Sequence, residues 1–160
     1  MHLTDLLSAD RVAIERQGAP GQPELTKTRT LAVLSALLAQ GTKLSPDAIE
    51  RVLAEREQLQ STGIGEGVAI PHGAMAQLET QCAALLIAPN GVDFAAIDGQ
   101  KVTILFAVIG PKRATGEHLK TLARVSRLLR NQGFRDRLVL APNSNTAYDL
   151  IATEEGGDKR

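Results

Sequence analysis

Aromatic residues are scarce in this chain of 160 residues, where they make up 2% of the composition and include no tryptophan. Proteins that bind single-stranded nucleic acid stack the bases on exposed aromatic rings, and so few rings cannot build that platform. Neither charge is in excess, because 18 Lys and Arg residues balance 18 Asp and Glu residues. A general nucleic-acid binder needs a basic excess or a concentrated basic face. We therefore expect no nucleic-acid partner.

Cysteine occurs once, at Cys82, so the chain forms no internal disulfide. No apolar stretch approaches the roughly 20 residues needed to cross a bilayer, and no signal-peptide pattern precedes the chain. These absences predict a soluble, cytoplasmic protein without membrane insertion. A chain of this length favours one domain, 1–160, that buries about two-thirds of its unfolded surface.

The first half of the chain predicts two long helices. A short apolar turn over 3–7 and a short strand over 12–14 come before a loop rich in proline and glycine, residues 17–24. Thr26 then caps a helix that Gly41 ends, and a second helix begins after the cap Ser45, with proline in its first position. That second helix is expected to end near residue 58.

Two nearly continuous apolar runs, 82–88 and 102–109, dominate the second half. Such runs suit strands that are buried on both faces and covered by helices. Between them, Asp98-Gly99 is a turn signal that joins the two strands as a hairpin. Because helices and strands are mixed rather than strictly alternating, we expect an α/β fold with a single mixed sheet and helices packed on it.

The C-terminal third predicts three further helical segments. The clearest covers 116–131, and its predicted apolar stripe consists of Leu119, Leu122, Ser126 and Leu129. Gly133 is expected to break that helix, and a short helix follows over 134–140. Asn145 is the expected cap of the last helix, which reaches Ile151. The charged tail, 154–160, is expected to fray.

The rest of the chain is organised around residues 61–73, which read STGIGEGVAIPHG. The stretch opens with Gly63, Gly65 and Gly67. The apolar run 68–70 follows, stops at Pro71 and presents His72. Because glycine permits tight turns and close approach while proline ends a strand, this pattern predicts a turn, a short strand and a displayed imidazole. Gly73 leaves room beside the ring for a partner.

Two familiar sites do not fit these residues. A dinucleotide fingerprint needs G-x-G-x-x-G between a strand and a helix, but here a helix precedes the glycines and Pro71 follows them. A P-loop would need Gly-Lys-Ser/Thr, which is missing. Zinc takes three or four ligands, whereas the chain offers His2, His72, His118, one cysteine and carboxylates without ligand spacing. We expect no metal site.

Nucleophilic histidine chemistry remains as the best interpretation. A neutral imidazole, abundant at pH 7, can attack phosphorus and form a phosphohistidine. Such a site needs an oriented ring and donors for the phosphoryl oxygens. Backbone N–H groups of the glycine-rich stretch, Arg56 and His118 are suitable, with His118 expected to look out of a helix N-terminus. Taken alone, Arg56, Glu57 and His118 are more simply solvated or boundary residues, and Cys82 a small buried hydrophobe.

Glu57 and the segment 64–73, IGEGVAIPHG, resemble the phosphorylation-site signature of the fructose/mannitol-type IIA components of the bacterial phosphotransferase system. The segments 92–94, 96–100, 102–109 and 117–120 resemble most the nitrogen-regulatory IIA proteins within that family. The resemblance covers about residues 3–153. The chain departs from the family pattern in a longer segment at 17–24 and in Ala95, where many relatives carry a polar or acidic residue.

The resemblance implies that His72 accepts phosphate from a phosphorylated HPr-like carrier. It implies that His118 is the second active-site histidine and that Arg56 holds the phosphate. Supporting roles would belong to Glu57, Gly63, Gly65, Gly67 and Gly73. The family fold is a mixed sheet with helices on both faces, and the family uses no metal or organic cofactor.

Three functions follow as alternatives. The leading one is a transient phosphohistidine carrier that regulates downstream partner proteins. The second, within the same family, is a sugar-specific IIA component that passes phosphate to a IIB domain. The third is an interaction module in which His72 is never phosphorylated.

Overall fold

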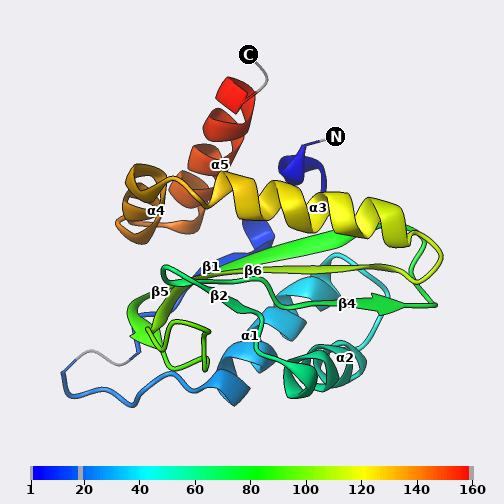
Figure 1. Cartoon of the computed structure of the whole chain (residues 1–160), viewed down its shortest axis with the longest axis horizontal. Helices are drawn as coiled ribbons and strands as arrows, with labels where there is room; N and C mark the ends of the chain where they lie inside the picture. Colours follow the sequence, from blue (N-terminus) through cyan, green and yellow to red (C-terminus); the bar gives the residue numbers. More distant parts are fainter. Residues whose placement is uncertain (1, 18–19, 159–160) are drawn as a thin grey trace.

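The computed structural model describes residues 2–17 and 20–158, and in it one sheet lies between two layers of helices (Figure 1). Two helices cover one face of the sheet: α1 (Lys27–Gln40) and α2 (Pro46–Leu59). Three cover the other: α3 (Thr115–Leu128), α4 (Gln132–Val139) and α5 (Ser144–Asp158). Two 3₁₀ turns, Leu3–Asp5 and Ala9–Arg11, precede the first strand. The predicted α/β architecture, a single mixed sheet flanked by helices on both faces, is confirmed.

The sheet has six strands: β1 (Val12–Ile14), β2 (Gly63–Gly65), β3 (Val68–Ala69), β4 (His72–Met75), β5 (Cys82–Val92) and β6 (Val102–Pro111). Their order is β1-β5-β6-β3-β2, and β4 also pairs with β6. The two long strands, β5 and β6, are antiparallel neighbours, as the turn at Asp98-Gly99 predicts. Strand β1 runs parallel to β5, and β3 and β4 run parallel to β6, whereas β2 and β3 are antiparallel.

The side chains of β5 and β6 alternate between two hydrophobic cores, because successive residues of a strand point to opposite faces. Under α3, α4 and α5 lie Ala83, Leu85, Ile87, Ile104, Phe106 and Val108. Under α1 and α2 lie Ala84, Leu86, Ala88, Leu105, Ala107 and Ile109. Both runs are therefore strands buried on both faces, as predicted.

Strand β5 is longer than predicted, because it continues through Pro89 to Val92 instead of ending at Ala88. The ladder with β6 is irregular between Ile87 and Val92. Proline has no N–H to donate to a ladder, so a strand can contain it only where the pairing is already interrupted. The irregularity therefore reconciles Pro89 with a strand.

The caps of the first two helices are as predicted. The side chain of Thr26 accepts from the N–H of Arg29 at 3.1 Å, and that of Ser45 accepts from the N–H of Ala48 at 3.2 Å. Pro46 is the first residue of α2, where its missing N–H costs nothing. Helix α2 thereby carries Arg56 in its last turn, just before the glycine-rich stretch.

The buried face of α3 differs from the predicted stripe by one residue. The side chains that face the sheet are His118, Thr121, Val125 and Leu128, whereas Leu119 is 60% exposed. One residue along a helix turns the side chain by about 100°. The expectation that His118 looks out of the helix N-terminus is therefore wrong, and this histidine lies on the inner face.

The starts of the last two helices also differ from prediction. Gly133 lies inside α4 rather than ending a helix, because α3 has already ended and the side chain of Asn131 caps α4 through Phe134 N–H at 2.9 Å. Helix α5 begins at Ser144 and is capped by Asn143, whose Oδ1 accepts from Thr146 N–H at 2.8 Å. Asn145, the predicted cap, lies within this helix.

The predicted fraying from residue 154 is wrong for the part of the tail that the structure describes. Helix α5 continues to Asp158, and Glu155 is only 2% exposed. Its carboxylate accepts from the N–H groups of Leu3 at 2.6 Å and Thr4 at 3.1 Å. These bonds tie the two ends of the chain together, and residues 159–160 lie outside the described residues.

Candidate active site

The strand that carries His72 is interrupted. Strand β3 and strand β4 both run parallel to β6, where Ala69 pairs with Leu105 and His72 pairs with Val108. Pro71 lies in the gap, and its carbonyl accepts from the N–H of Val108 at 3.0 Å. Strand β3 ends at Ala69, one residue earlier than the predicted run 68–70, and the chain resumes after Pro71 as β4, so His72 begins a strand instead of lying in a loop.

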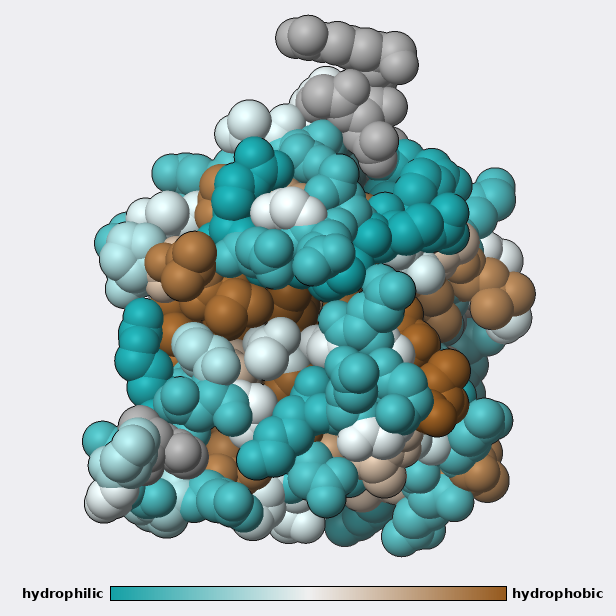
Figure 2. Space-filling view, turned by 60° about the vertical axis from the view of Figure 1, so that its left-hand side comes forward, coloured by the Kyte–Doolittle hydropathy of each residue, from teal (hydrophilic) through white to brown (hydrophobic). Residues whose placement is uncertain are grey.

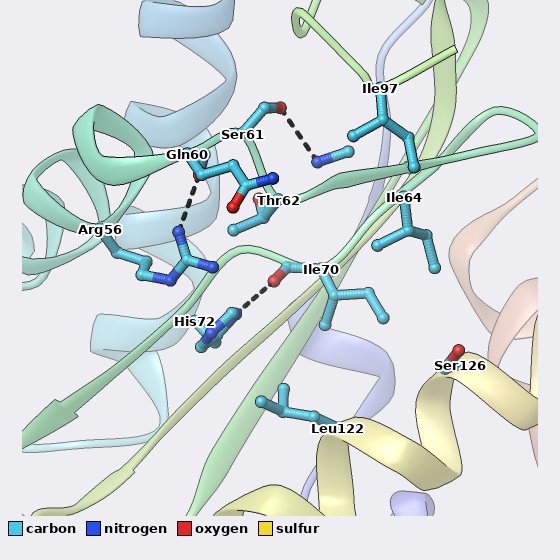
Figure 3. Close-up of a pocket in the computed structure, with 11 residues that line it drawn as sticks. Arg56, Gln60, Ser61, Thr62, Ile64, Ile70, His72, Ile97, Leu122 and Ser126 are labelled. Carbon is cyan, nitrogen blue, oxygen red and sulfur yellow. Dashed lines mark hydrogen bonds between the residues drawn. The ribbon is translucent and has the colours of Figure 1, made fainter.

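The interruption orients the imidazole of His72. Its Nδ1 lies 2.7 Å from the carbonyl oxygen of Ile70, two residues earlier (Figure 3). A carbonyl oxygen can only accept, so Nδ1 carries the proton and donates it. In the neutral ring the unshared electron pair is then on Nε2. Burial, partly offset by this hydrogen bond, holds the pKa of His72 below its ordinary value, which keeps the ring neutral at pH 7.

His72 lines a cavity of about 340 Å³ (Figure 3). The cavity lies between the end of α2, the segment from β2 to β4 and one side of α3. Its lining residues are Arg56, Gln60, Ser61, Thr62, Gly63, Ile64, Ile70, His72, Ile97, Leu122 and Ser126. On the face turned forward in Figure 2, hydrophobic side chains gather in a hollow with hydrophilic margins. The cavity is therefore mostly apolar, with a histidine and an arginine as its charged or titratable groups.

Arg56 reaches the same cavity from the last turn of α2. Its Nη1 donates to the carbonyl oxygen of Gln60 at 2.7 Å, which holds the guanidinium beside the cavity (Figure 3). Arg56 is one of the causes that lower the pKa of His72, after burial. An arginine has five N–H donors, so after this bond most of them remain for an anion.

His118 lies beside His72, with 5.7 Å between the ring centroids and 51° between the ring planes. It is 9% exposed, since α3 holds it against the sheet. Burial lowers the pKa of His118, and the neighbouring His72 lowers it further. The structure thus brings the two predicted histidines together, although His118 is not among the residues that line the cavity.

Glu57 anchors the segment that follows α2. Its carboxylate accepts from the N–H of Thr62 at 3.0 Å and from the hydroxyl of the same residue, and it pairs with Lys27 at 2.8 Å. The Lys27 ammonium also donates to the carbonyl of Phe94 at 3.2 Å. Glu57 therefore fixes the backbone of the cavity wall and does not itself line the cavity.

Of the four predicted glycines, only Gly63 lines the cavity. The β2–β3 hairpin turns at Glu66 and Gly67, whose φ angles of 58° and 79° match a two-residue turn of type I′. Gly65, at φ 99°, precedes that turn. A Cβ on Gly73 would lie 2.4 Å from Cγ1 of Val52, so α2 packs there without space to spare. In this structure these three glycines serve turning and packing, and their support of a phosphate stays a prediction.

Sequence reasoning missed the apolar part of the cavity. Ile97 is 70% exposed and Ile64 is also exposed, both at the cavity wall, while Leu122 closes the side formed by α3. One feature of the sequence could have revealed this apolar wall: Ile97 directly precedes the Asp98-Gly99 turn, where a polar residue is the ordinary choice. The apolar spacing of α3 could not show that Leu122 lines a cavity rather than packing in the core.

Within residues 2–17 and 20–158, no three His, Cys, Asp or Glu side chains come together as metal ligands do. Over the same residues, no helix is both long enough and apolar enough to cross a membrane. Cys82 is buried at the start of β5, as the small-hydrophobe interpretation predicts, and burial raises the pKa of its thiol.

The family model described as "Phosphoenolpyruvate-dependent sugar phosphotransferase system, EIIA 2" matches residues 21–154. The chain belongs to this family. Among similar EIIA 2 relatives, a nitrogen regulatory protein of Bradyrhizobium diazoefficiens is 34% identical over 152 residues, which are 95% of each chain. One of Pseudomonas aeruginosa is 33% identical over 91% of this chain and 99% of its own.

The solved structure of the nitrogen regulatory protein IIA-Ntr from Neisseria meningitidis has the same fold, with a TM-score of 0.83 at 28% identity. The match covers 93% of this chain and 98% of the other. The resemblance drawn from the residues around His72 is therefore confirmed. This EIIA 2 protein is a phosphotransferase-system component, and its nitrogen-regulatory relatives support the role of phosphocarrier.

Proposed function

We propose that His72 is the phosphoacceptor of this EIIA 2 protein and receives its phosphoryl group, on Nε2, from a phosphorylated HPr-like carrier. The observation that supports this is the contact of 2.7 Å between Nδ1 and the Ile70 carbonyl. It keeps the proton on Nδ1 and leaves the electron pair of Nε2 for attack. The mostly apolar cavity lined by His72 gives the phosphoryl group of the carrier access to the ring.

The transfer step needs few groups from this chain. The electron pair of Nε2 forms a bond to phosphorus, the bond from phosphorus to the carrier's histidine nitrogen breaks, and that electron pair returns to the carrier. No proton has to leave His72, because Nδ1 keeps its own. The phosphorylated ring then carries a positive charge, which the carbonyl of Ile70 stabilises through the hydrogen bond it already accepts.

Arg56 and His118 are the groups we assign to the phosphoryl oxygens. Arg56 lines the cavity with free N–H donors, and donors held in place before the reaction stabilise charge as it develops. His118 is 5.7 Å from His72 between ring centroids, so its ring can approach an oxygen of a group on Nε2. Glu57 supports Arg56 by holding the segment between α2 and β2, whose Gln60 carbonyl accepts from Arg56.

For the next step we favour regulation of partner proteins in the cytoplasm. The motivation is that the nitrogen regulatory relatives match over almost their entire lengths, 95% and 99%. Because the family description also names sugar phosphotransfer, a IIB domain is the competing acceptor. Rapid loss of the phosphoryl group to a IIB domain from the same organism would favour sugar transport over regulation.

The test is phosphorylation with phosphoenolpyruvate, the first enzyme of the phosphotransferase chain and its HPr-like carrier. Wild type is expected to gain one acid-labile phosphoryl group by intact mass, and ³¹P–¹⁵N NMR is expected to place it on Nε2 of His72. His72→Gln should not be labelled, whereas the matched control His2→Gln should be labelled like wild type. Labelling of His72→Gln at the wild-type level, or a wild type that never labels, would refute the proposal.

A further inference from the structure

Two buried polar side-chain atoms have no hydrogen-bond partner in the described part of the chain, namely Oε1 of Gln81 and Nδ1 of His118. Buried polar atoms without a partner are rare, because each costs free energy relative to the hydrated atom. Neither atom is used by the chemistry assigned to His72. These two unpaired atoms therefore call for a common explanation.

Both atoms belong to side chains that flank Gly110. A Cβ placed on Gly110 would lie 3.3 Å from Nδ1 of His118 and 3.1 Å from Cγ of Gln81. The strand register explains this, because Cys82 of β5 is opposite Ile109 of β6, which sets Gln81 beside Gly110. Helix α3 brings His118 over the same point. A residue with any side chain at position 110 would enter the space that separates the two.

The protonation of His118 explains why the two atoms do not bond in the unphosphorylated protein. Burial and the neighbouring His72 both lower the pKa of His118, so its ring is neutral and carries one proton. With that proton on Nε2, Nδ1 is an acceptor, and so is Oε1 of Gln81, whose side chain also flanks Gly110. Two acceptors cannot share a hydrogen bond.

We propose that Gln81 is a positioning residue for His118: when a phosphoryl group is on His72, Oε1 of Gln81 accepts a hydrogen bond from Nδ1–H of His118. This inference rests on the proposed function of His72. A dianionic group beside the ring favours uptake of a proton from solvent, and the resulting imidazolium has an N–H on both nitrogens. One is needed by a phosphoryl oxygen, and the other needs an acceptor inside the protein.

Gln81 supplies that acceptor without a charge of its own. Three residues on the strands lie near the His118 ring: His72 on β4, Gly110 on β6 and Gln81 directly before β5. Of these, His72 is the titratable one. A neutral amide lets the ring lose its proton again when the phosphoryl group leaves, whereas a carboxylate at this position would keep the ring charged. Gln81 therefore makes the charge of His118 follow the phosphorylation of His72.

The direct test is an acid titration of the His118 ring by NMR in the unphosphorylated protein, since acid also produces the imidazolium. In Gln81→Leu, proton binding by His118 should weaken about tenfold, as expected for the loss of a hydrogen bond to a charged group. In Gln81→Glu it should strengthen. Gln77→Leu, the same change at an exposed glutamine of the preceding segment, should titrate like wild type.

The second readout is the rate of phosphoryl transfer to His72, which should fall about tenfold in Gln81→Leu and remain unchanged in Gln77→Leu. An amide spectrum checks that each variant is folded, and Gln81→Glu provides a second variant if Gln81→Leu is not. Wild-type titration of His118 in both Gln81 variants would overturn the inference. A wild type that titrates as expected but never labels would refute the proposed function instead and leave the Gln81–His118 hydrogen bond standing.

Discussion

The imidazole Nδ1 of His72 lies 2.7 Å from the carbonyl oxygen of Ile70, across the proline that separates β3 from β4. Proline has no N–H to donate, so the pairing with β6 is interrupted between Ala69 and His72. The carbonyl of Ile70 then faces the ring two residues later. A local interruption of the sheet thus selects the nitrogen of His72 that can act as nucleophile.

The first prediction concerns the pH dependence of phosphoryl transfer. Burial lowers the pKa of His72 below about 6.5, the ordinary value, and only the neutral ring can attack phosphorus. The decline of transfer to His72 in acid should therefore be centred below pH 6.5, at the lowered pKa. Initial labelling rates between pH 5 and 8, with pre-phosphorylated carrier in excess, measure this. A decline already centred above pH 6.5 would contradict it.

The same shifts predict how stability depends on pH. The pKa values of His72 and His118 are both lowered in the folded state, so below about pH 6.5 the unfolded chain binds more protons. Their contribution to stability is complete above pH 6.5 and is lost as the pH falls through the folded pKa values. Urea unfolding at pH 7.5 and 5.5 should show this loss, and the double variant His72→Gln/His118→Gln should lose less. Equal losses in both proteins would argue against this prediction.

A third prediction concerns the packing of α2 against β4. In Gly73→Ala the new Cβ would lie 2.4 Å from Cγ1 of Val52, and overpacking of this kind costs about 1–3 kcal/mol in free energy of unfolding. Adding Val52→Ala removes the clashing methyl group and should restore most of the loss. Urea denaturation of the single and double variants measures the coupling. Additive losses in the double variant would show that Val52 is not the obstacle.

A fourth prediction concerns Glu57, whose carboxylate holds Thr62 and Lys27. In Glu57→Ala the buried N–H of Thr62 loses its acceptor, which should lower the free energy of unfolding by about 2 kcal/mol. Transfer to His72 should also slow, because the cavity wall contains Thr62. Glu55→Ala, at an exposed position of the same helix, is the control. If Glu57→Ala had the same free energy of unfolding as Glu55→Ala, the structural role assigned to Glu57 would be wrong.

A fifth prediction concerns the exposed apolar rim of the cavity. Ile97 is 70% exposed at the cavity wall, so Ile97→Asp should leave stability within about 0.5 kcal/mol of wild type. The charge should nevertheless raise the KM for the phosphorylated carrier, because docking has to remove water from this rim. Leu140→Asp, at an 80% exposed leucine outside the cavity, should transfer like wild type. Identical KM values for the two variants would exclude Ile97 from the docking surface.

Sequence alone predicted the helices that carry strong local signals. Thr26 and Ser45 cap α1 and α2 through their own side chains, and the continuous apolar runs of β5 and β6 admit little besides strands buried on both faces. It failed at α3, where Leu119 is exposed and His118 buried. Both residues fit a helix equally well, and only the position of the sheet decides which one faces inward.

The stretch 61–73 by itself singled out His72 as the candidate phosphoacceptor, because glycine permits the turns and proline ends the run whatever surrounds them. The tertiary structure decided the rest of the site. Arg56 and His118 come from helices on opposite faces of the sheet, and the approach of two segments distant in sequence depends on packing rather than on local preference. The placement of Gln81 against His118 belongs to the same class, because it depends on the register of β5 and β6 at Gly110.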